Sequence, residues 1–103
     1  MKSLTLNVST QWFNDAREGR KTEEYRLANE YWTKRLFDKD GKPKEFKDIK
    51  YKLGYPPASD NNRVITFVWE GFEKKVIVHP HFDNKPVEVY AIKIRERVTN
   101  GLG

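Results

Sequence analysis

Hydrophobic and polar residues alternate along six short stretches of the chain, and this alternation is typical of half-buried β-strands. In the first stretch Leu4, Leu6 and Val8 fall on one face. In the second, Tyr25 and Leu27 are the residues predicted to face the core. The predicted strands cover residues 3–8, 22–28, 46–53, 63–70, 72–79 and 87–98.

Two short helices are predicted in the first third of the chain. Ser9 or Thr10 can cap the first helix, and Gly19 ends it in the usual position for a C-terminal glycine. Asn29 can cap the second helix, which runs to Leu36.

Glycine and proline mark the connections between the predicted strands. Gly71 separates residues 63–70 from residues 72–79, and we expect these two strands to form a hairpin. Residues 38–45 and 54–62 are predicted loops, the second because two consecutive prolines remove backbone donors.

The order of these elements predicts a single α+β domain over residues 1–103, with its core in residues 3–98 and a flexible tail at 99–103. Six strands in a short chain leave sheet edges that closure into a barrel would remove. The sequence therefore predicts a small β-barrel of about six strands with two short flanking helices.

The composition narrows the classes of protein to which the chain can belong. It contains no cysteine, which excludes disulfides, zinc–thiolate sites and thiol catalysis. Residues 1–7 are interrupted by polar side chains too often for the core of a signal peptide. No apolar run approaches the roughly 20 residues that a membrane helix needs. We expect a cytoplasmic protein that does not contact a membrane.

Positive charge is concentrated in one segment. The chain carries a formal net charge of +5, and residues 34–52, with eight Lys or Arg and four Asp or Glu, contribute +4 of it. Such a surface favours polyanions through phosphate contacts and counterion release, although a solvated lysine-rich loop is the alternative. The residues assigned to electrostatic contact with nucleic acid are Lys34, Arg35, Lys42, Lys44 and Lys47.

Two short patterns resemble metal sites but lack the necessary ligands. Residues 38–41 read Asp-Lys-Asp-Gly, like the start of a calcium loop, but Ile49 stands where the bidentate acid belongs. His79 and His81 stand at strand spacing, whereas a metal site usually needs three or four converging ligands. We expect no metal and no cofactor, and histidines that bond locally or line the mouth of a cleft.

Residues 19–26 carry the most informative chemistry. Lys21 lies at the start of a predicted strand, and Glu24 and Arg26 share one face of it, about 6–7 Å apart. Two cations around one carboxylate can orient a phosphate or the polar edge of a base. A salt-bridged junction between helix and strand is the structural alternative. Because exposed ion pairs contribute about 0–1 kcal/mol, we expect Ala at positions 21 and 26 to leave stability nearly unchanged.

Gly19, Lys21, Glu24 and Arg26 match the pattern Gly-x-Lys-x-x-Glu-x-Arg, and the chain thereby resembles the ASCH domain family. The resemblance extends over residues 3–98 and includes the Leu-Thr-Leu strand and the helix ahead of the pattern. It implies a PUA-like β-barrel associated with RNA binding. It also implies that Lys21, Glu24 and Arg26 line a cleft beside the barrel and that Gly19 is a backbone requirement.

Aromatic side chains near such a cleft can stack on bases. Trp32 stands close to basic residues on the second helix, and Tyr55 stands on the proline-stiffened loop. Both are assigned to ligand binding, together with Lys21, Glu24 and Arg26. Trp12 and Trp69 are assigned to the core.

These observations predict a module that binds RNA or a nucleotide-like ligand. A second hypothesis is a small hydrolase acting on RNA or a modified nucleoside, with Lys21 and Glu24 as its catalytic pair. Some ASCH-like proteins resemble amidohydrolases in which a threonine nucleophile follows the lysine by three positions, and here that position is Glu24. A third hypothesis is a domain that binds an acidic protein partner.

Overall fold

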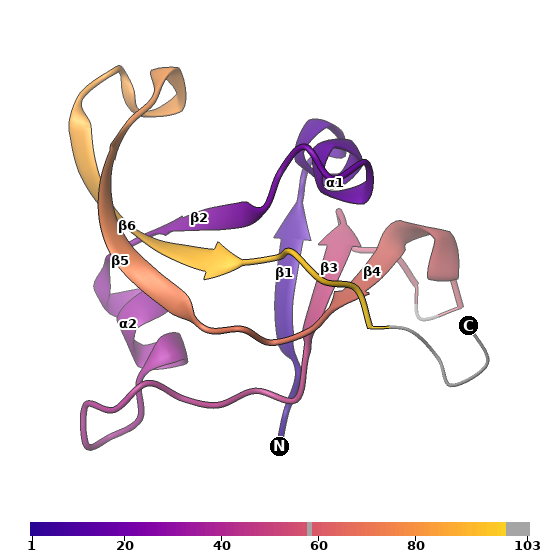
Figure 1. Ribbon diagram of the computed structural model, residues 1–103, viewed down its shortest axis with the longest axis horizontal. Helices are drawn as coiled ribbons and strands as arrows, with labels where there is room; N and C mark the ends of the chain where they lie inside the picture. The colour runs from indigo at the N-terminus through magenta and orange to yellow at the C-terminus, as the bar shows by residue number, and fades with distance from the viewer. Residues whose placement is uncertain (58, 99–103) are drawn as a thin grey trace.

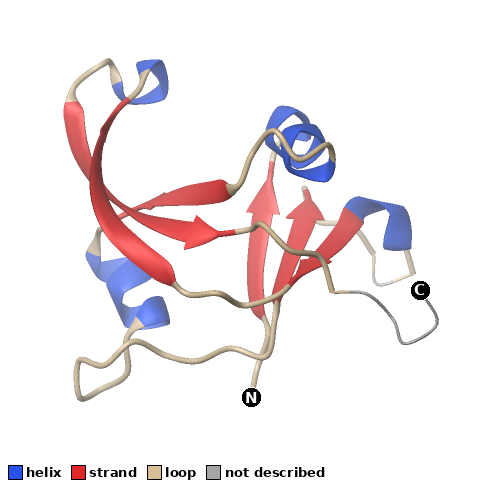
Figure 2. Ribbon diagram, in the orientation of Figure 1, coloured by secondary structure: helices blue, strands red, loops and turns tan. Residues whose placement is uncertain are grey.

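The structure is a computed structural model that describes residues 1–57 and 59–98. The tail predicted at residues 99–103 lies outside the described residues. Two α-helices, six strands and two short 3-10 helices occur in the described part, which confirms the α+β class (Figure 2). In chain order they are β1 (Leu4–Val8), α1 (Thr10–Arg17), β2 (Glu23–Leu27), α2 (Glu30–Leu36), β3 (Ile49–Leu53), η1 (Asn61–Arg63), β4 (Val64–Phe67), β5 (Phe72–Val78), η2 (Pro80–Phe82) and β6 (Pro86–Lys93).

The strands form two three-stranded sheets (Figure 1). One sheet has the order β1–β3–β4, with β1 parallel to β3, and the other is antiparallel with the order β2–β6–β5. The chain after β6 crosses to the first sheet, where the amide of Val98 donates to the Thr66 carbonyl (2.9 Å) on β4. No closed barrel is found in residues 1–57 and 59–98, so the predicted barrel is not confirmed.

The hairpin predicted between residues 63–70 and 72–79 is wrong. β4 pairs with β3 in one sheet, whereas β5 pairs with β6 in the other. Gly71 adopts a left-handed φ of +87°, but it turns the chain out of one sheet and into the other. Alternation shows which face of a strand is buried, and it does not show which strand is the neighbour.

One hydrophobic core joins the two sheets. Leu4, Leu6 and Val8 on β1 are buried, as predicted. The ring of Tyr51 on β3 is completely buried and lies 6.2 Å from that of Phe13 on α1. Residues 89–92 of β6 are all buried, so this part of the strand is covered on both faces.

Caps place both helices as predicted. Gly19 has a φ of +80°, and its amide donates to the Ala16 carbonyl (3.2 Å), which ends α1 and reverses the chain toward β2. Asn29 caps α2, because its side chain accepts a hydrogen bond from the Trp32 amide (2.9 Å). Ser9 is the N-cap residue of α1, but its side chain makes no capping bond. Among the described residues, no helix has the length and apolar character needed to cross a membrane.

Candidate functional site

Glu24 is the buried residue of β2, and this reverses the predicted orientation of the strand. Glu24 is 6% exposed, whereas Leu27 is 42% exposed and Tyr25 is half-buried. On the neighbouring strand Glu24 lies opposite Ile92, which is fully buried. The prediction failed because it assumed that the more hydrophobic residues face inward, while the charge of Glu24 is compensated by residues elsewhere in the fold.

Three donors surround the Glu24 carboxylate. The Lys21 Nζ lies 3.4 Å from Oε1, the Arg26 Nη2 lies 2.9 Å from Oε2, and the Tyr51 hydroxyl donates to Oε1 at 3.0 Å. The side chains of Lys21 and Arg26 are only 14% and 21% exposed. The assumption that these ion pairs are exposed is therefore wrong, and we now expect removal of either cation to destabilise the protein, because it leaves a buried carboxylate short of a partner.

Arg26 connects the edges of the two sheets. Its Nη2 also donates to the Asn7 carbonyl on β1 at 3.1 Å. Its guanidinium lies 5.1 Å from the ring centroid of Trp32, within the range of a cation–π contact. Its Nε is buried and has no hydrogen-bond partner among the described residues. Protein atoms therefore satisfy this guanidinium only in part.

A pocket of about 510 Å³ lies between β1 and β2, the edge strands of the two sheets. Lys21, Glu24 and Arg26 all line it, so the structure brings these three predicted site residues together. The other lining residues come from the end of β1, from both helices, from β2 and from the β5–η2 segment. They are Asn7, Val8, Ser9, Trp12, Tyr25, Leu27, Asn29, Trp32, Ile77, His79, His81 and Phe82.

Two tryptophans contribute aromatic surface to this pocket. Trp32, assigned to ligand binding, lines it, although the residue is only 9% exposed. Trp12, assigned to the core, packs partly against the core and also lines the pocket, with the Lys21 Nζ 4.8 Å from its ring centroid. The sequence indicated that Trp12 could lie near the site. The helix that carries Trp12 ends next to Gly19, so it must lie beside Lys21 and the strand that follows.

The segment after β5 adds two histidines to the pocket. In Figure 1 the tip of the β5–β6 hairpin, which η2 forms, and α1 both lie at the upper end of the view. His79 Nδ1 accepts a hydrogen bond from the His81 amide (3.0 Å), and the His79 ring lies 6.3 Å from that of Trp12. No group of three or more His, Cys, Asp or Glu in residues 1–57 and 59–98 is placed to hold a metal ion.

Tyr55 and Trp69 lie away from this pocket. Tyr55 is 92% exposed and is not among the lining residues, so the structure does not bring it to the other predicted ligand contacts. Trp69 packs partly against the core, and its Nε1 donates to Glu45 (3.2 Å).

The predicted electrostatic residues separate into three locations. The guanidinium of Arg35 lies 4.7 Å from the ring centroid of Trp32, but Arg35 itself does not line the first pocket. Lys34 and Lys44 line a second pocket, on the other side of α2. Lys42 and Lys47 are exposed on the loop between α2 and β3 and line neither pocket.

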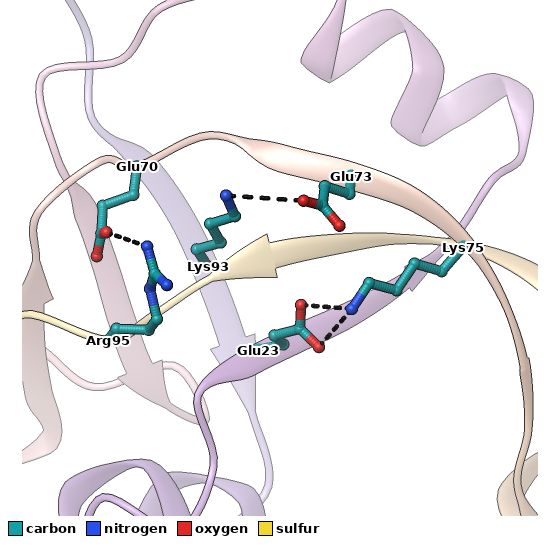
Figure 3. A network of polar contacts seen from close by, with 6 residues as sticks. All are labelled: Glu23, Glu70, Glu73, Lys75, Lys93 and Arg95. Atoms are coloured by element: carbon teal, nitrogen blue, oxygen red, sulfur yellow. Dashed lines mark hydrogen bonds and ion pairs between the residues drawn. The ribbon is translucent and has the colours of Figure 1, made fainter.

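The two faces of β2 have different electrostatic environments. Burial raises the pKa of the Tyr51 hydroxyl, and the adjacent Glu24 carboxylate raises it further, so the hydroxyl remains a donor. Figure 3 shows the opposite face, where Lys75 donates to both oxygens of Glu23 at 3.1 and 2.9 Å. This hydrogen bonding lowers the pKa of Glu23. The face of β2 that carries Glu23 thus has paired charges in contact with solvent. The face that carries Glu24 has a carboxylate and two cations in a pocket.

No family model matches the chain, and neither a curated protein nor a solved structure matches it.

Proposed function

We propose that this protein binds RNA by enclosing one nucleotide in the pocket between β1 and β2. The observation that carries the proposal is the placement of Lys21, Glu24 and Arg26 beside the indole rings of Trp12 and Trp32 in one cavity. Aromatic faces stack on bases, at about 1–3 kcal/mol per base, and cations hold phosphates or the acceptor atoms of a base edge.

The size and charge of the pocket support this proposal. Its volume of about 510 Å³ lies within the roughly 300–1,000 Å³ of pockets that hold small ligands. Two cations beside one carboxylate leave the pocket with more hydrogen-bond donors than acceptors, which suits an anionic or acceptor-rich ligand. The carboxylate of Glu24 is an acceptor for the amino group of a base.

Binding is better supported than hydrolysis. The charge of Glu24 is paired with Lys21 and Arg26, so a proton taken from a substrate would neutralise the carboxylate and weaken both ion pairs. Thr22, the threonine nearest to Lys21, is exposed and does not line the pocket. Ser9 lines the pocket, but among the described residues no hydrogen bond joins its hydroxyl to His79 or His81, so the arrangement offers a binding surface without an activated nucleophile.

Membership of the ASCH family and a PUA-like topology are parts of the proposal, as is the cytoplasmic location expected from the composition. The support for the family is that the Gly-x-Lys-x-x-Glu-x-Arg spacing coincides with a physical unit. Gly19 ends a helix, and the three charged residues meet in one pocket.

The proposal is tested by fluorescence titration with single-stranded RNA, duplex RNA and nucleoside monophosphates, because Trp12 and Trp32 would report a ligand between them. Saturable binding is expected for single-stranded RNA and for at least one monophosphate. The variant Lys21→Met should lose this binding. The matched control is Lys75→Met, which removes a lysine from a Lys–Glu pair on the opposite face of the same sheet.

If both variants lost binding equally, the loss would be explained by the lower net charge of the protein, and the assignment of the ligand to this pocket would be contradicted. Absence of any binding to RNA or monophosphates in the parent protein would refute the proposed function and favour an acidic protein partner. Circular dichroism and thermal unfolding of each variant separate loss of binding from loss of folding.

A further inference from the structure

A second pocket, of about 770 Å³, lies on the other side of α2 from the first. Three aromatic residues, Phe37, Phe72 and Tyr90, line it. Their rings contact one another, with centroids 5.3 Å apart for Phe37–Phe72, 5.5 Å for Phe72–Tyr90 and 5.8 Å for Phe37–Tyr90. Phe37 and Phe72 are half-buried, so part of this aromatic surface is open to a ligand.

Lysines surround the aromatic surface. The four that line the pocket are Lys34, Lys39, Lys44 and Lys74. Within the described residues Lys34 pairs with Glu30 and Lys74 pairs with Glu88, whereas Lys39 and Lys44 form no ion pair. The pocket therefore has a positive rim.

The one carboxylate that lines this pocket is engaged by its own turn. Asp38 Oδ1 accepts hydrogen bonds from the amides of Asp40 and Lys42, each at 2.9 Å. The amide of Asp38 donates in turn to the Lys42 carbonyl at 2.8 Å. The loop that resembles the start of a calcium site is thus a closed turn that holds Lys39 and Lys44 at the edge of the pocket.

The two pockets share a wall. Arg26 lines the first pocket and is the cross-strand partner of Tyr90, which lines the second. Trp32 and Thr33 are consecutive residues of α2 that line the first and the second pocket respectively. The Thr33 Oγ1 lies 2.6 Å from the Tyr90 hydroxyl, which fixes the wall between helix and sheet. Directly paired residues of neighbouring strands point to the same face of a sheet, so the two pockets are neighbours on one face of the β2–β6–β5 sheet, with α2 between them.

We propose that the two pockets bind neighbouring nucleotides of one single-stranded RNA. The first encloses a base, and the second holds the phosphate of a neighbouring nucleotide at its lysines and the base on its aromatic surface. This inference rests on the proposed function and specifies its ligand as an oligonucleotide, not a free nucleotide. Single-stranded RNA is the suitable form, because its bases can leave the stack and enter pockets.

The test compares two double variants that remove the same charge from the same loop. Lys39→Gln with Lys44→Gln neutralises two lysines that line the second pocket. Lys42→Gln with Lys47→Gln neutralises two that do not. Affinities are measured by anisotropy for a labelled RNA hexamer, and by competition for nucleoside monophosphates, at several salt concentrations.

For the parent protein, the hexamer should bind at least about tenfold more tightly than the best monophosphate, a gain typical of a second linked site. The Lys39/Lys44 variant should lose most of this gain, and its salt slope should fall by about 0.7 for each phosphate that the protein no longer neutralises. Its affinity for monophosphates should be unchanged. The Lys42/Lys47 variant should retain most of the gain.

Three outcomes overturn the inference. They are equal weakening of the hexamer by both variants, a hexamer no tighter than a monophosphate, and loss of monophosphate affinity in the Lys39/Lys44 variant. The second outcome leaves the proposed function intact if monophosphates still bind and Lys21→Met abolishes that binding. The failure of the second pocket is therefore distinguishable from the failure of the first.

Discussion

The Tyr51 hydroxyl on β3 donates a hydrogen bond of 3.0 Å to the Glu24 carboxylate on β2, and this bond joins the two sheets through the core. Both residues are buried. The carboxylate that the ligand would meet is thus anchored to the interior of the protein on one side, while Lys21 and Arg26 hold it on the other. The same contacts that stabilise the fold fix the geometry of the candidate site.

Replacing Tyr51 by Phe tests this anchor. The variant keeps the ring between Phe13 and Phe67 but removes the donor to a buried, charged acceptor. Hydrogen bonds to charged groups contribute about 1.5–3 kcal/mol, so the free energy of unfolding should fall by that order. Urea denaturation should show a lower midpoint with an unchanged slope. An unchanged midpoint would show that the bond has no structural role.

Arg26→Ala should destabilise the protein by leaving Glu24 buried with fewer partners. Breaking a fully buried ion pair costs about 3–5 kcal/mol, and the loss here should be smaller because the Arg26 side chain is 21% exposed and partly screened by water. Adding Glu24→Gln should restore part of the loss, since the neutral amide is less costly to bury. The check is a double-mutant cycle from chemical denaturation. Simple additivity of the two changes would contradict the coupling.

Glu23 gives a prediction about pH. Its hydrogen bonds from Lys75 lower its folded-state pKa below the ordinary value of 4.5. The carboxylate therefore contributes stability that is complete above about pH 4.5 and is lost as the pH falls below that value through the folded-state pKa. The free-energy difference between the parent protein and Glu23→Gln should be largest near neutral pH and should shrink on acidification. A difference that does not change with pH would contradict the assignment.

Gly19→Ala tests the turn between α1 and β2. Gly19 has a φ of +80°, and a Cβ at this position would meet nothing within 4 Å, so the expected cost comes from backbone strain alone. A left-handed non-glycine residue costs about 1–2 kcal/mol. Thermal unfolding should show a loss of that size. Gly71→Ala, at a φ of +87° on the β4–β5 connection and outside both pockets, is the matched control. Both variants should lose similar stability, but only Gly19→Ala should also weaken ligand binding, because it displaces Lys21.

Local structure was largely predictable from the sequence. The strand at Leu4–Val8, the cap at Asn29 and the helix end at Gly19 follow from short-range patterns, because each depends on residues within one turn or one strand. The spacing of Glu24 and Arg26 likewise placed them together, since residues two apart on a strand share a face, and Lys21 was predicted at the start of the same strand. The tertiary structure had to show what that face meets.

The α+β class, most of the elements and the charged cluster on β2 thus follow from the amino-acid sequence. Only the folded chain shows that β4 pairs with β3 instead of β5, that Glu24 and not Tyr25 faces inward, and that Trp12 joins the pocket while Tyr55 does not. The difference arises because strand pairing and the compensation of a buried charge depend on residues far apart in the chain. The donor from Tyr51 lies 27 positions from Glu24, and no local pattern of hydrophobic and polar residues contains that contact.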